Sequence, residues 1–159
     1  MEPTTRFQLT NVVLAVLAVG HALATWPVRA TAALFLGGAA LAFLAEAAVV
    51  RAGLLEHAMA PRVAGVPLAV VAAWPAIVYL CLRLALLVRP PGLAAAGLAA
   101  VLATAFDLLT DPTGVDAGVW TYPDHPVSAP RVAGVPWWNF AGWLGLVFVS
   151  ATLPLAAGL

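Results

Sequence analysis

Charge is scarce in this chain, and lysine is absent altogether. Only 9% of the 159 residues are charged, whereas a soluble domain carries about 25%. Seven arginines balance seven carboxylates, so no basic surface is available for nucleic acid, which we exclude as a partner. The single cysteine, Cys81, excludes an internal disulfide and a thiolate metal cluster.

Apolar residues take the place of charge, at 64% of the chain and a mean hydropathy of +1.01. A spanning helix needs about 20 mostly apolar residues. Proline, glycine and charged residues divide the chain into five such runs, at 10–26, 30–50, 66–88, 92–109 and 137–159. We therefore predict an all-α membrane helix bundle of about five spans, forming one integral membrane domain over 1–159. The first run could also be a cleaved signal peptide, but an anchor helix fits the apolar sequence downstream better.

An identical stretch of eight residues occurs twice. Residues 60–67 and 129–136 both read Ala-Pro-Arg-Val-Ala-Gly-Val-Pro, and a tryptophan, Trp74 or Trp143, follows each copy after seven residues. Proline and glycine at a helix start would explain Gly-Val-Pro alone but not the arginine. Because carboxylates end the run before each copy, we predict a parallel repeat of two-helix units over about 30–88 and 92–159. This repeat would bring both acid-bearing helix ends to one membrane face.

Three carboxylates, Glu46, Asp107 and Asp111, lie within or at the end of apolar runs, where each costs about 3 kcal/mol to insert. Asp107 and Asp111 are four residues apart and would share one helix face. Like charges at this spacing disfavour double ionisation, so one of them would hold a proton, as a general acid must. Two simpler interpretations stay open. Glu46 could snorkel or pair with Arg51, and Asp111 with Pro112 could merely end the helix in water.

Aromatic side chains are concentrated near the acidic end of the last run, at Trp120, Tyr122, Trp137, Trp138, Phe140 and Trp143. Trp74 and Trp143 lie about two turns inside their helices, too deep for an interfacial belt. We expect them to face packed protein or an apolar ligand, where a ring can stabilise a carbocation. Trp26 and Trp137 are expected in the interfacial belt. Asn139 is an expected hydrogen-bond partner for a carboxyl group or a water molecule.

The histidines are weaker signals. His21 is expected at the interface opposite the acids, and His57 and His125 lie in connections without metal-ligand spacing. No nucleotide-binding loop, serine nucleophile motif or zinc signature occurs. We therefore expect neither a cofactor nor a metal.

The order of the polar and aromatic residues resembles that of a known family. The resemblance rests on Asp-Leu-Leu-Thr-Asp-Pro at 107–112, Trp-Thr-Tyr at 120–122, Gly-Val-Pro-Trp-Trp-Asn-Phe-Ala-Gly-Trp at 134–143, and upstream on Glu46, Gly53, 65–68 and Trp74. Over about residues 40–145 the chain is similar to the membrane carotenoid biosynthesis proteins, which include the bacterial carotenoid 1,2-hydratases and the haloarchaeal bisanhydrobacterioruberin hydratase. It departs from them at 51–57, where they carry a glycine- and aromatic-rich stretch.

The resemblance implies a cofactor-independent hydratase, a hydro-lyase that adds water to a terminal double bond of an acyclic carotenoid end. Asp107 or Glu46 would donate the proton, while Asp111 and Asn139 would place the water. Arg62 and Arg131 would pair with the acids or tune them. The residues expected to bind the substrate are Trp74, Trp143, Asn139, Trp120, Tyr122, Phe140 and Trp138.

Two other functions stay open. A non-catalytic membrane protein could bind or transfer a carotenoid or another polyprenoid. A small proton or ion transporter could use paired acids, but its acids would be spread through the membrane depth. As partners we expect a carotenoid or other polyprenoid substrate, membrane lipid and other enzymes of the carotenoid pathway. The excess of arginine on the acidic face predicts that this face is cytoplasmic in the cell membrane.

Overall fold

The computed structural model describes residues 1–159 and contains five helical segments long and apolar enough to cross a membrane. They are α1 (Pro3–Thr25), the continuous segment of α2 (Val28–Ala32), the π-helical η1 (Ala33–Gly37) and α3 (Gly38–Arg51), then α4 (Leu68–Leu86), α5 (Leu93–Asp116) and α6 (Trp137–Ala156). The predicted all-α membrane bundle is confirmed. Each spanning helix pairs its own backbone groups, which a lipid environment requires.

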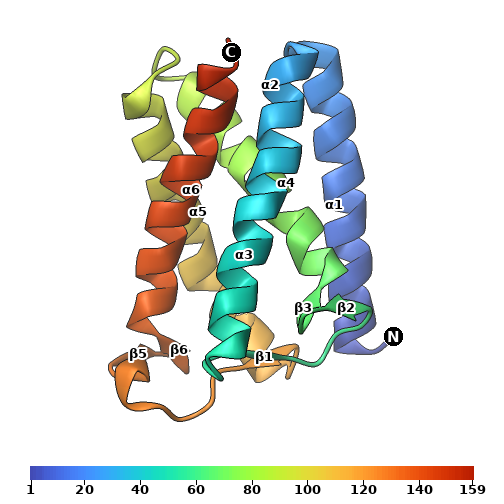
Figure 1. The fold of residues 1–159 in the computed structure, drawn as a ribbon, viewed down its shortest axis with the longest axis vertical. Coiled ribbons are helices and arrows are strands. Elements are labelled where there is room, and N and C mark those ends of the chain that lie inside the picture. The colour runs from blue at the N-terminus through green and yellow to red at the C-terminus, as the bar shows by residue number, and fades with distance from the viewer.

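The helices alternate in direction, so the longer connections gather at one end of the bundle. The N-terminus, residues 52–67 and residues 117–136 lie at this end, which we call the loop face (Figure 1). The C-terminus lies at the opposite end (Figure 1). The apolar runs predicted that the N-terminus and the two long connections lie on the same membrane face. This arrangement places the ends of α3 and α5, which carry Glu46 and the pair of Asp107 and Asp111, at the loop face.

Both copies of the eight-residue stretch form a small β-hairpin. Strand β2 (Arg62–Val63) pairs with β3 (Val66–Pro67), and β5 (Arg131–Val132) pairs with β6 (Val135–Pro136) in the matching register. The Ala-Gly loops have positive φ at both positions, 50° and 83° in the first and 48° and 83° in the second. A type I′ turn requires this geometry, and glycine adopts it without steric cost. The sequence predicted a helix start here but not the hairpin.

A third pair of strands joins the two long connections. Strand β1 (Glu56–His57) pairs antiparallel with β4 (Trp120–Thr121), and His57 lies opposite Trp120. A short 3-10 helix, η2 (Pro126–Ser128), follows in the second connection. The pairing of β1 with β4 fixes the two connections to one another over the acid-bearing helix ends.

Helix α5 is longer than predicted. It continues past Leu109 to Asp116 with Pro112 inside it, so the interpretation that Pro112 ends the helix is wrong. The last turns are held by packing, because Gly114 lies directly beneath the ring of Trp120. A Cβ at this glycine would lie 2.1 Å from Trp120 Cζ2. Helix α1 also begins earlier than predicted, at Pro3 instead of residue 10.

Helix α5 contributes small side chains to the core away from the loop face. Helix α5 buries alanines 95, 96, 99, 100 and 103 almost completely, which allows close approach of its neighbours α4 and α6. Trp26 is buried here, with its ring edge-to-face against Tyr79 at 4.7 Å. The prediction of Trp26 as an interfacial belt residue is therefore wrong. His21 Nδ1 lies 2.5 Å from the hydroxyl of the same tyrosine.

Candidate active site

A cavity of about 440 Å³ lies in the half of the bundle nearest the loop face. Its walls come from α1, α3, α4, α5, α6 and the two connections, and they are mostly apolar. Glu46, Asp107 and Asp111 all line it. The volume is within the usual range of small-molecule sites, about 300–1,000 Å³. The three carboxylates singled out in the sequence therefore share one cavity.

Asp107 and Asp111 form a buried pair on α5. Their exposed fractions are 4% and 3%, and the four-residue spacing brings both to one face of the helix. Asn139 of α6 connects them, since its Nδ2 donates to Asp107 Oδ2 at 2.9 Å and to Asp111 Oδ2 at 2.6 Å. One amide group carries two N–H donors and can serve both acceptors. The interpretation that Asp111 lies in water is wrong.

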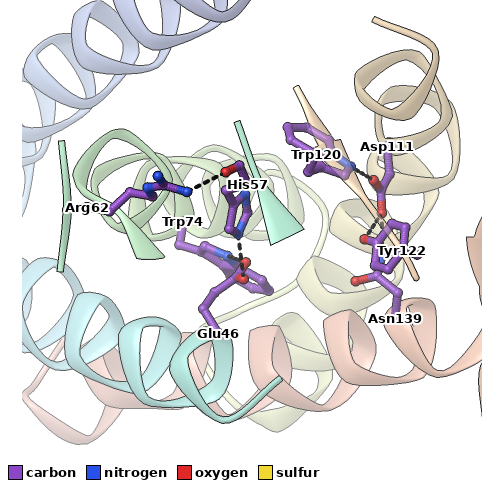
Figure 2. Close-up of polar contacts among 8 residues, drawn as sticks. All are labelled: Glu46, His57, Arg62, Trp74, Asp111, Trp120, Tyr122 and Asn139. Atoms are coloured by element: carbon purple, nitrogen blue, oxygen red, sulfur yellow. Dashed lines mark hydrogen bonds and ion pairs between the residues drawn. The ribbon is translucent and has the colours of Figure 1, made fainter. Parts of the chain in front are cut away.

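Asp111 has two further donors from the second connection. The hydroxyl of Tyr122 donates to Oδ2 at 2.7 Å, and Trp120 Nε1 donates to Oδ1 (Figure 2). Burial, together with the neighbouring carboxylate, raises the pKa of Tyr122 far above its usual range, so this residue stays a neutral donor. Asp111 thus accepts from three side chains, whereas Asp107 accepts from Asn139 alone.

Glu46 is held on the other side of the site by two partners. Its Oε2 lies 3.3 Å from His57 Nε2, and its Oε1 accepts from Trp74 Nε1 at 3.4 Å (Figure 2). The side chain of Glu46 is 14% exposed, and that of His57 is 3% exposed. Arg51 is exposed and makes no ion pair with Glu46, so the interpretation of a simple end-of-helix pair is wrong.

His57 is a site residue that the sequence analysis missed. It was assigned to a connection because nothing in the spacing of the histidines indicated a partner. The β1 and β4 pairing buries it against the cavity, and its Nδ1 has no hydrogen-bond partner. The only sequence signal was its place between two apolar pairs, 54–55 and 58–59, which is too weak to indicate a buried histidine.

The two repeated arginines do not contact the acids. Arg62 Nη1 donates to the backbone carbonyl of His57 at 2.7 Å (Figure 2). Arg131 donates to the carbonyl of Tyr122 at 2.8 Å and forms an ion pair with Asp124 at 3.4 Å. The predicted pairing with Glu46, Asp107 and Asp111 is therefore not observed. The hairpins hold both guanidinium groups among the connections, where backbone carbonyls need donors. Arg62 thereby restrains His57 and Arg131 restrains Tyr122, two residues that line the cavity.

The aromatic residues divide into cavity wall and support. Trp74 and Trp143 stack with ring centroids 4.0 Å apart and planes at 19°, and both line the cavity. Trp120 and Tyr122 also line it. Trp138 does not line it but packs edge-to-face on Tyr122 at 5.8 Å. Phe140 lies behind the wall as well, beside Leu55, Tyr122 and Val135.

Helix α1 adds residues that the sequence did not indicate. Asn11 lines the cavity at 7% exposure, and its Nδ2 has no hydrogen-bond partner in the protein. Phe7 packs edge-to-face on Trp120 at 5.0 Å. A buried amide without a partner is costly. Asn11 is therefore available to a water molecule or a ligand in the cavity.

Comparison with known families gives one result. A family model described as carotenoid biosynthesis protein matches residues 7–157. The match covers four spans completely and most of α1, and so extends beyond residues 40–145, where the motifs were recognised. No curated protein and no solved structure gives a significant match.

Proposed function

Because the chain belongs to the family of carotenoid biosynthesis proteins, we propose that it is a cofactor-independent hydratase. It adds water to a terminal double bond of an acyclic carotenoid end. The observation that carries the proposal is the buried pair of Asp107 and Asp111, bridged by Asn139, in a mostly apolar cavity lined by two stacked tryptophans. Family membership supports a role in carotenoid metabolism, and this site supports hydration as the reaction.

Asp107 donates the proton. Three side-chain donors to Asp111 stabilise its carboxylate form. Asp107 lies beside that negative charge with one donor only, so the proton of the pair resides on Asp107. Transfer of this proton to the less substituted carbon of the terminal double bond leaves a tertiary carbocation on the neighbouring carbon. The pair is then fully ionised and faces a cation.

Trp74 and Trp143 stabilise the cation. Both rings line the same cavity as the acid pair, and an aromatic ring near a desolvated cation contributes about 2 kcal/mol. The carboxyl group of Glu46 lies beside these rings, because Trp74 donates a hydrogen bond to it. His57 holds the second oxygen of Glu46, which keeps this carboxylate from moving onto the cation itself.

A water molecule placed by Asn139 and Asp111 captures the cation. Its oxygen forms the new bond to the tertiary carbon, and the proton it loses returns to the acid pair. The product is a tertiary alcohol, and the enzyme recovers its starting protonation without a cofactor. Asn11, whose Nδ2 has no protein partner, supplies a further donor to this water from α1.

The test is the mass of the carotenoid formed. Asp107→Asn and Glu46→Gln variants are produced in a host that makes acyclic carotenoids, and the extracted pigments are examined for an added water. We expect Asp107→Asn to abolish the hydrated product and Glu46→Gln to reduce it. Asp116→Asn is the matched control, because Asp116 is an exposed carboxylate at the end of the same helix and does not line the cavity. Full activity in Asp107→Asn would overturn the assignment of the proton donor, and full activity in both variants would overturn the assignment of the site.

The second candidate is a non-catalytic protein that binds or transfers a carotenoid, which the apolar cavity also favours. It predicts that pigment copurifies with the protein while the carotenoid masses stay unchanged after its gene is deleted. A proton or ion transporter fits less well. Glu46, Asp107 and Asp111 all lie in the loop-face half of their helices, which leaves the other half of the membrane without an acid.

A further inference from the structure

The cavity has its opening between two particular helices. The exposed residues of its lining all belong to α1 or to α5 with its C-cap. The lining residues from α3, α4, α6 and the remaining connections are buried or half-buried. Thr10 on α1 and Phe106 and Thr110 on α5 are the exposed lining residues farthest from the loop face. The mouth of the cavity is therefore a gap between α1 and α5.

Helix packing explains why this gap stays open. Helix α1 packs mainly against α4, and α5 packs against α4 and α6. Helix α4 crosses the bundle obliquely, near α1 at the loop face (Figure 1). The buried alanines of α5, at 95–103, occupy the half farther from the loop face. Nearer the loop face, α1 and α5 do not pack closely on one another, and Trp120, against Gly114 of α5 and Phe7 of α1, connects the two sides of the gap.

The gap faces lipid over much of its length. At about 1.5 Å per residue, Thr10, Thr110 and Phe106 lie about 9–15 Å from the loop-face ends of their helices. The hydrocarbon core is about 30 Å thick, so the mouth extends toward the middle of the bilayer. Exposed apolar residues flank it, among them Val13 at 48% and Leu109 at 77% exposure.

We infer that this gap is a lateral portal for a linear polyisoprenoid chain dissolved in the bilayer. The end of the chain enters between α1 and α5 and reaches the acids, while the remaining length stays in the lipid outside. A cavity of about 440 Å³ accommodates an end group but not an entire carotenoid, so the rest of the chain must leave through the mouth. The chemistry at the inner end rests on the proposed function, but the route does not.

Narrowing the portal tests the inference. Thr10→Phe and Thr110→Phe place a bulky ring in the mouth, whereas Val16→Phe and Leu108→Phe place the same ring at exposed positions of the same helices that do not line the cavity. Each protein is reconstituted in phosphatidylcholine vesicles that contain lycopene, an acyclic carotenoid. Two quantities are measured, the quenching of tryptophan fluorescence by the bound polyene and the yield of hydrated product. Thermal unfolding is measured for all four variants to check that each of them is folded.

We expect both portal variants to lower the apparent affinity in the quenching assay by about tenfold or more, because the new ring takes up space that the outgoing part of the chain occupies. The two control variants should match the wild type. Portal variants that quench like the controls would overturn the inference, and so would a wild type that shows no quenching. If lycopene quenches the fluorescence of the wild type but no hydrated product forms, the proposed function is wrong. The affinities of the portal and control variants then still test whether the gap is the route of entry.

Discussion

Trp74 and Trp143 stack on one another with their ring centroids 4.0 Å apart. Each follows its hairpin by seven residues, Trp74 after Pro67 and Trp143 after Pro136. The two copies of the repeated stretch thus bring equivalent tryptophans together in the wall of one cavity. In the proposed reaction this pair is the surface that meets the carbocation.

Replacing Trp143 with leucine should slow hydration by about tenfold or more, because the cavity keeps an apolar wall but loses a ring that stabilises the cation. Trp143→Phe should retain more activity than Trp143→Leu. Initial rates of hydrated carotenoid formation provide the measurement. Trp137→Leu serves as the control, because Trp137 is 50% exposed and lies outside the cavity wall. Equal rates for leucine and phenylalanine at Trp143 would contradict a role for the ring.

Gly114→Ala should displace Trp120 and weaken its hydrogen bond to Asp111, because the new Cβ would lie 2.1 Å from the indole ring. We expect a loss of hydration activity and a destabilisation of about 1–3 kcal/mol from overpacking. Gly97→Ala on the same helix meets nothing within 4 Å and should be neutral or slightly stabilising. Thermal unfolding in detergent and the product assay distinguish the two. Similar unfolding temperatures for both variants would show that Trp120 moves freely.

Arg131→Met should loosen the second connection, because the guanidinium donates to the carbonyls of Tyr122 and Pro123. The loss should be about 1–3 kcal/mol of stability, with reduced activity because Tyr122 holds Asp111. Arg89→Met is the matched control, since Arg89 is exposed in the turn on the opposite face. Hydrogen exchange over 120–136 measures the loosening directly. Unchanged exchange there would show that the arginine does not restrain the connection.

Asn11→Leu should lower the rate of hydration without lowering stability. The amide has no protein partner, so an apolar replacement of similar size removes a buried polar group at no structural loss. The expected signature is a reduced kcat with little change in affinity for the carotenoid, because the amide serves the water and not the hydrocarbon. Thermal unfolding and fluorescence quenching check stability and binding. A fall in carotenoid affinity with unchanged kcat would assign Asn11 to the substrate instead.

Local patterns in the sequence determined the class of protein and much of the site. Runs of apolar residues set the spans, because each helix in lipid must be apolar and long enough by itself. The four-residue spacing of Asp107 and Asp111 placed both acids on one helix face, since helical geometry is local. The position of Asn139 near the start of the last span was enough to suggest it as a partner for these carboxyl groups, as observed.

Contacts between distant segments decided the rest. The pairing of β1 with β4 buried His57 against Glu46, and no local pattern encodes which connections meet. Helix α5 continues beyond Pro112 although proline usually ends a helix, and the packing of Trp120 on Gly114 stabilises these last turns. Arg62 and Arg131 found backbone carbonyls in the folded connections instead of the acids. The sequence by itself determined which groups lie at which depth and face, whereas tertiary structure chose their partners, because hydrogen bonds and burial depend on three-dimensional proximity.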